Sequence, residues 1–145
     1  MQTLKKLLII LTLIIATSYS FAQSQNDLTV ENSQNDTLVV LWTSGDPEVA
    51  ENVCLMYTHA AAKSGWFKTV ILIVWGPSAN LLSNNHKLQS KVKSMISDGI
   101  HVRACIVCAN SYRVSDQLRD IGIEVLGMGK PLTGYLKSGY PILTF

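Results

Sequence analysis

The chain has 145 residues, a formal net charge of +2 and 15% charged residues. This length leaves room for one small domain, and a nearly balanced charge without a basic stripe argues against nucleic-acid binding. The three cysteines, an odd number, exclude a disulfide scaffold.

The first 22 residues predict a removable signal peptide. Lys5 and Lys6 precede an apolar run over residues 7–16, and Ser20 and Ala22 are small residues of the kind that a signal peptidase recognises. As a helix, that run would be about 15 Å long, half of a hydrocarbon core of about 30 Å. We therefore expect export to the periplasm or the exterior, without a stable membrane anchor.

The segment over residues 23–36 is polar and rich in Gln, Asn and Ser, with only Leu28 and Val30 as sizeable apolar residues. So few apolar groups do not offset the entropy of ordering a segment. We expect a flexible leader there, followed by one domain over residues 37–145.

The domain begins with an apolar run over residues 37–43, which predicts a strand buried on both faces. Asp46 and Pro47 then match the cap and the first position of a helix that we expect to end at Gly65. The apolar residues at helical spacing that predict its buried face are Val49, Val53, Met56, Tyr57 and Ala60.

The second half repeats this alternation of strands and helices. Strands are predicted over residues 68–75, 100–106 and 123–126. Helical segments are predicted over residues 78–82, from Asn84 or Asn85 to Gly99, over residues 110–121 with a break near Arg113, and over residues 130–137. Buried strands alternating with helices indicate an α/β fold with a parallel sheet covered on both faces.

Ligands of such sheets bind outside the carboxyl ends of the strands. Four loops meet this condition, over residues 43–46, 75–78, 106–110 and 127–131. The third of these carries the pair Cys105 and Cys108, where a strand ends and a helix begins. A helix start favours the thiolate form, and Arg103, Arg113 and Lys130 are candidate positive neighbours.

Alternatives remain open for these residues. Cys105 and Cys108 also suit simple core packing, as does Cys54 in the first helix. The chain offers no second Cys-x-x-Cys or His-x-x-x-His, so we expect no metal site, and nothing points to a cofactor. Trp75 and Met128 suit either a pocket wall or the core. The histidines, which show no mutual spacing, are interpreted as surface or loop residues: His59, His86 and His101.

Three segments together resemble the DsrE/DsrF-like family. They are residues 104–114 (ACIVCANSYRV), residues 75–78 (WGPS) and residues 127–132 (GMGKPL). The resemblance covers the whole domain from Leu38 onward, and the segment with the cysteines is its most specific part.

The resemblance implies a three-layer α/β/α fold with a mostly parallel sheet of about five strands, assembled as a trimer or hexamer. It also implies a persulfide carried on Cys105, with Cys108 as a second thiol. Relatives often have glycine where Arg113 stands, so a positive φ there would strain arginine. The expected binding residues around the thiols are Trp75, Gly76, Pro77, Ser78, Asn110, Met128 and Lys130.

The leading hypothesis is thiol-based sulfur handling, in which Cys105 accepts and passes sulfane sulfur with Cys108 assisting, in exchange with a donor or acceptor protein. One alternative is a thiol–disulfide redox protein that uses the same pair of cysteines. The other alternative is a non-enzymatic domain for binding a small ligand or for assembly. The sequence leaves open whether the protein is an enzyme.

Overall fold

The computed structural model describes residues 36–145, so the predicted signal peptide and most of the predicted leader lie outside the described residues. The strands are β1 (Thr37–Trp42), β2 (Thr69–Val74), β3 (His101–Cys105), β4 (Glu124–Leu126) and β5 (Ile142–Thr144). The helices are α2 (Pro47–Val49), the π-helical turn η1 (Ala50–Cys54), α3 (Leu55–Lys63), α4 (Pro77–Asn84), α5 (His86–Ser97), α6 (Ile106–Ser111), α7 (Ser115–Asp120) and α8 (Gly129–Lys137).

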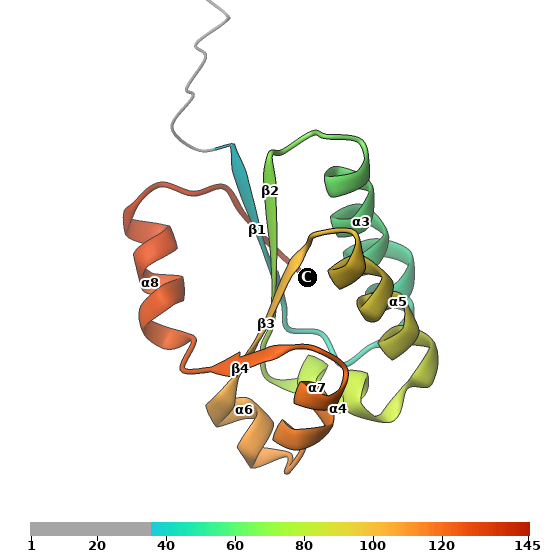
Figure 1. The fold of residues 1–145 in the computed structure, drawn as a ribbon. Helices are drawn as coiled ribbons and strands as arrows, with labels where there is room; N and C mark the ends of the chain where they lie inside the picture. Colours follow the sequence, from blue (N-terminus) through green and yellow to red (C-terminus); the bar gives the residue numbers. More distant parts are fainter. Residues whose placement is uncertain (1–35) are drawn as a thin grey trace, which may run out of the picture. The chain divides into compact units, whose positions relative to one another are not determined.

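The strands form one sheet in the order β4-β3-β2-β1-β5, and every neighbouring pair is parallel. Helices α3, α4, α5 and α7 pack on one face, and α8 packs on the other (Figure 1). This is a three-layer α/β/α fold with an all-parallel sheet, as the sequence predicted. Among residues 36–145, no helix is both long enough and apolar enough to cross a bilayer.

Side chains of each strand alternate between two apolar clusters. Leu38, Val40 and Trp42 of β1 belong to the larger cluster under α3, α4, α5 and α7, which we call the helix-rich face. Val39 and Leu41 belong to the smaller cluster under α8, which we call the α8 face. Trp42 is fully buried, and within the described part of the chain its indole N–H has no hydrogen-bond partner.

The predicted ends of several elements are confirmed. The Asp46 carboxylate accepts hydrogen bonds from the backbone N–H groups of Glu48 and Val49, at 2.7 and 3.0 Å. A cap of this kind contributes about 1 kcal/mol. Gly65 has a φ of 65° and Gly99 a φ of 91°, both in the left-handed region that favours glycine at the end of a helix.

The predicted buried face of the first helix is wrong in part, because Tyr57 packs against the core as predicted whereas Val53 and Met56 do not. Val53 is 43% exposed and Met56 is 57% exposed. The side chains that face the core instead are Ala50, Cys54, Leu55, Thr58 and Ala61. The buried residues Ala50, Cys54, Thr58 and Ala61 keep helical spacing but lie one residue further along the chain than the predicted ones, so that mostly small side chains face the sheet.

Candidate functional site

The two predicted thiols lie at the carboxyl end of the sheet. Cys105 is the last residue of β3 and precedes the first residue of α6, and Cys108 lies in the first turn of that helix. Residues three apart at a helix start point the same way. The strand-to-helix junction therefore brings both sulfur atoms to the α8 face, where both cysteines belong to the smaller apolar cluster.

The two thiols form a pair of unequal exposure. Cys105 is only 4% exposed, whereas Cys108 is partly exposed. The Cys105 side chain and the backbone N–H of Gly76 both lie near the Cys108 sulfur, since each of them shifts the pKa of Cys108. Neither cysteine is in a disulfide. A reagent from solvent therefore meets Cys108 first, and Cys105 lies behind it.

The expectation that the helix start favours the thiolate is wrong for Cys108. Burial raises the pKa of the Cys108 thiol, and the adjacent Cys105 side chain raises it further. The hydrogen bond from the Gly76 N–H lowers this pKa, but by less than burial raises it. Removal of water from the sulfur outweighs the backbone donors, since an apolar surrounding disfavours the charged form.

Gly76 places its N–H against the Cys108 sulfur through an unusual backbone conformation. Its φ is 67° and its ψ is −132°, a combination that side-chain-bearing residues rarely adopt. Pro77 follows at the first position of α4, where a missing N–H does no harm. The loop between β2 and α4 is thus shaped by Gly76 and Pro77 to deliver a hydrogen-bond donor to the site.

Ser78 holds this loop to the neighbouring strand. Its buried hydroxyl donates to the backbone carbonyl of Trp42 at 2.6 Å, lies 3.1 Å from the carbonyl oxygen of Trp75, and accepts from the Trp75 N–H at 3.0 Å. The role that these contacts support is to fix the loop rather than to touch a ligand.

The other predicted site residues fall into two groups. Trp75 and the fully buried Met128 join both thiols in the cluster on the α8 face. Pro77, Asn110 and Lys130 are exposed. The Asn110 side-chain oxygen accepts a hydrogen bond from the Ser115 hydroxyl at 2.6 Å, which ties α6 to α7.

The candidate positive neighbours are engaged elsewhere or lie at the surface. The Arg103 guanidinium donates to Glu124 at 2.8 Å and to the Tyr135 hydroxyl at 2.7 Å. Arg113 is exposed in the turn between α6 and α7, with a φ of 59°. This positive φ confirms that arginine occupies a backbone position that suits glycine.

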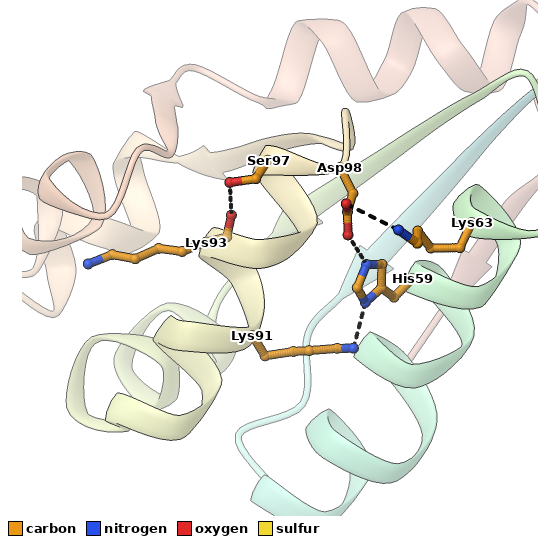
Figure 2. Close-up of polar contacts among 6 residues, drawn as sticks. All are labelled: His59, Lys63, Lys91, Lys93, Ser97 and Asp98. Carbon is orange, nitrogen blue, oxygen red and sulfur yellow. Dashed lines mark hydrogen bonds and ion pairs between the residues drawn. The ribbon is translucent and has the colours of Figure 1, made fainter.

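Sequence reasoning missed a second group of polar side chains, which lies on α3 and α5. His59, interpreted from the sequence as a surface or loop residue, contacts both Lys91 and Asp98 (Figure 2). No local pattern could reveal it, because 39 residues separate His59 from Asp98. Within residues 36–145, no three side chains of His, Cys, Asp or Glu come together as a metal ion would require.

Comparison with known proteins gives two structural relatives, whereas no protein-family profile and no curated protein matches the chain. One relative is BT1422 from Bacteroides thetaiotaomicron, described as a conserved protein of unknown function. It is 35% identical with a TM-score of 0.74, and the match covers 76% of this chain and 95% of that chain.

The other relative is the YchN protein from E. coli. It is 15% identical with a TM-score of 0.59, and the match covers 77% of this chain and 99% of that chain. At this identity the likeness concerns the fold alone, and the fold is DsrE-like. The identity and coverage of the first relative show more: the chain belongs to the same family as the conserved Bacteroides protein BT1422.

Proposed function

We propose that the chain is a thiol-based sulfur carrier in which Cys105 holds sulfane sulfur as a persulfide and Cys108 passes it in and out. The observation that carries the proposal is the pair of neighbouring thiols at the sheet edge, one sheltered and one partly exposed. The DsrE-like fold supports it, since the sulfur relays that the sequence resembles share that fold.

The exchange is balanced and needs no oxidant. The Cys108 thiolate attacks the outer sulfur of a donor persulfide, R–S–SH, so that the donor leaves as a thiol and Cys108 becomes the persulfide. The Cys105 thiolate then attacks the same outer sulfur, and Cys108 returns to the thiol. The low exposure of Cys105 shelters the bound sulfur from other thiols in solution.

Intact-mass analysis after incubation with inorganic polysulfide tests this proposal. We expect a gain of about 32 Da, one sulfur atom, mapped to Cys105 in the wild type. Cys108→Ala should keep this adduct but form it more slowly, and Cys105→Ala should carry the sulfur on the partly exposed Cys108 instead, where added thiol removes it faster than from the wild type. Cys54→Ala is the matched control and should behave like the wild type. The absence of any adduct on the wild type would exclude sulfur carriage.

The pH dependence of sulfur uptake provides a second test. Because the pKa of Cys108 is raised above its ordinary value of 9.0, its thiolate fraction is still increasing at that pH. The uptake rate should therefore continue to rise above pH 9.0 in the wild type. A rate that levels off well below this pH would mean that Cys108 is not the entry point.

A thiol–disulfide redox role is the second candidate, and the direct contact between the two thiols favours it. In that case Cys105 attacks the inner sulfur of the Cys108 persulfide, which forms the disulfide and releases hydrosulfide. The same mass experiment separates the two roles, since a disulfide lowers the mass by about 2 Da instead of raising it.

We also propose that the mature protein is exported and forms a homo-oligomer through the α8 face. One helix covers this face, and Leu136 of that helix is 61% exposed. Sedimentation of the wild type should give a trimer or hexamer, and Leu136→Glu should shift it toward the monomer.

The export proposal has its own test. The N-terminal sequence of the secreted fraction should begin after residue 22, and an uncleaved N-terminus would contradict export by this route.

A further inference from the structure

A pocket of about 460 Å³ lies between α3 and α5, outside the thiol site. This volume is within the range of about 300–1,000 Å³ that is usual for small-molecule sites. The pocket is lined by Glu51, Asn52, Met56, His59, Ala60, Lys63, Lys87, Leu88 and Lys91. Part of its wall is the π-helical turn η1, a feature that often accompanies functional sites.

A chain of hydrogen bonds fixes the polar wall of this pocket. The Lys91 ammonium donates to Nδ1 of His59 at 2.6 Å, and Nε2 of His59 lies 2.6 Å from the Asp98 carboxylate (Figure 2). An ammonium group can only donate a hydrogen bond and a carboxylate can only accept one. The His59 ring therefore carries its N–H at Nε2 and donates a hydrogen bond from it to the Asp98 carboxylate. Lys63 also donates to Asp98, at 3.3 Å.

This arrangement places a cation instead of leaving it free. The His59 side chain is only 15% exposed, and Lys91 is partly buried. Lys91 gives one N–H to His59, so its remaining N–H groups can bind an acceptor in the pocket. A lysine held in this way loses less side-chain entropy on binding than a free surface lysine does.

The charge and polarity of the lining select the ligand. Of the three lysines that line the pocket, Lys87 is paired with Glu51 and Lys63 with Asp98, whereas Lys91 contacts the His59 ring and keeps its positive charge available to a ligand. The same pocket has an apolar part made by Met56, Ala60 and Leu88, and Met56 is 57% exposed to solvent. A ligand that suits both parts has an acidic group and an apolar body.

We propose that this pocket binds a small organic anion, whose acidic group is held by Lys91 and Lys63 and whose apolar body covers Met56 and Leu88. The observation that carries the proposal is the positioning of Lys91 by the chain from Asp98 through His59. The site is separate from the paired thiols and does not depend on the proposed sulfur chemistry.

Titration by NMR, with labelled methionine methyl groups and histidine rings, tests the proposal on the full mature chain. The probes are hexanoate, hexyl phosphate, hexanol, hexylammonium and inorganic phosphate. We expect hexanoate and hexyl phosphate to shift the Met56 and His59 signals saturably. Hexanol and hexylammonium should bind at least about tenfold more weakly. Hexanol lacks the anionic group that makes the charge-assisted hydrogen bond, and the cation of hexylammonium is repelled by the lysines. Inorganic phosphate should move His59 but not Met56.

Charge-removing variants complete the test. Lys91→Gln should weaken hexanoate binding by about tenfold, and Lys63→Gln should weaken it to a smaller extent. Lys93→Gln is the matched control, because Lys93 is an exposed lysine of α5 that does not line the pocket and points away from it (Figure 2). Circular dichroism checks that all three variants are folded.

Three results would each overturn the proposal. The first is that no probe shifts the Met56 signal. The second is that hexanol binds as tightly as hexanoate, which would show that the pocket does not select an anion. The third is that Lys91→Gln changes the sedimentation of the protein and leaves hexanoate binding unchanged, because the pocket would then be a contact between copies of the chain.

Discussion

The two faces of the sheet differ in depth and in the chemistry that they hold. The helix-rich face buries Cys54 completely, together with most of the large apolar side chains. The α8 face holds a smaller cluster under one helix, and it contains Cys105 and the partly exposed Cys108. A cysteine is therefore a buried core residue on one face, as Cys54 is, and accessible to reagents on the other, as Cys108 is. We infer that the interior of the helix-rich face supplies stability, whereas the proposed sulfur chemistry belongs to the α8 face.

Alkylation should show the largest contrast between the two faces. Burial raises the pKa of Cys54 to about 12, against an ordinary value of 9.0. Its thiolate is thus on the order of a thousandfold scarcer at neutral pH than that of an ordinary thiol. Peptide mapping after iodoacetamide treatment should find Cys108 modified and Cys54 modified only in denaturant. Equal labelling of both in the native protein would contradict the assignment of the two faces.

Core truncation should come next in size. Leu72 and Ile71 are neighbours on β2 that point to opposite faces, and Ile71 is 7% exposed whereas Leu72 is fully buried. Leu72→Ala should lower the free energy of unfolding by about 4 kcal/mol, and Ile71→Ala by about 2 kcal/mol. Denaturant titration measures both. An equal loss would mean that the α8 face is packed as firmly as the other.

Gly76→Ala should damage the α8 face in a specific way. A methyl group there meets no atom within 4 Å, so the cost comes from the φ of 67° alone, and we expect a loss of about 2 kcal/mol. The displaced N–H should also slow alkylation of Cys108. Gly127→Ala is the matched control, since it also has open space and its φ is not positive. An unchanged Cys108 rate in Gly76→Ala would remove the loop from the site.

Alkaline pH should weaken the helix-rich face through Cys54. Because the pKa of Cys54 is raised in the folded state, the neutral thiol contributes fully to the free energy of unfolding below pH 9.0. This contribution to stability is lost as pH rises from 9.0 toward about 12. The unfolding constant should gain up to about tenfold per pH unit in that window from this group. Cys54→Ala should show a shallower slope in pH-dependent denaturation, and an identical slope would contradict the assignment.

The smallest expected effect lies where α6 joins α7. Arg113 has a φ of 59°, so Arg113→Gly should raise the free energy of unfolding by about 1 kcal/mol. Arg113→Ala keeps the Cβ atom that strains the backbone at this φ, so it should not raise the free energy of unfolding. Thermal denaturation of the two variants distinguishes strain relief from loss of the arginine charge, because only the second cause would affect both equally.

The sequence was informative where one residue determines the local backbone. Asp46, Pro47 and Gly65 predicted the ends of a helix, and the Arg113 position was identified as a candidate for positive φ. Cys105 and Cys108 were placed correctly at a strand-to-helix junction, because a strand followed by a helix fixes which end of the sheet they occupy.

The failures share a cause, which is that they depend on contacts between distant segments. Val53 and Met56 lie at the surface because the buried residues of the helix are offset by one position from the predicted ones, and only packing against the sheet decides between the two sets. The pKa of Cys108 depends on burial by side chains that are far apart in the sequence and meet only in the folded protein. The contact between His59 and Asp98 arises only when α3 and α5 pack side by side.

The fluorescence of the buried Trp42 indole can report on the helix-rich face separately from the α8 face. Its N–H has no partner within the described residues, so its fluorescence should be emitted at short wavelength, from an apolar and unpaired ring. Trp75 lies partly buried beside the paired thiols, and Trp66 is 57% exposed. Emission from the three rings can therefore be separated by selective quenching, and unfolding of the helix-rich face can be followed independently of events near the sulfur atoms.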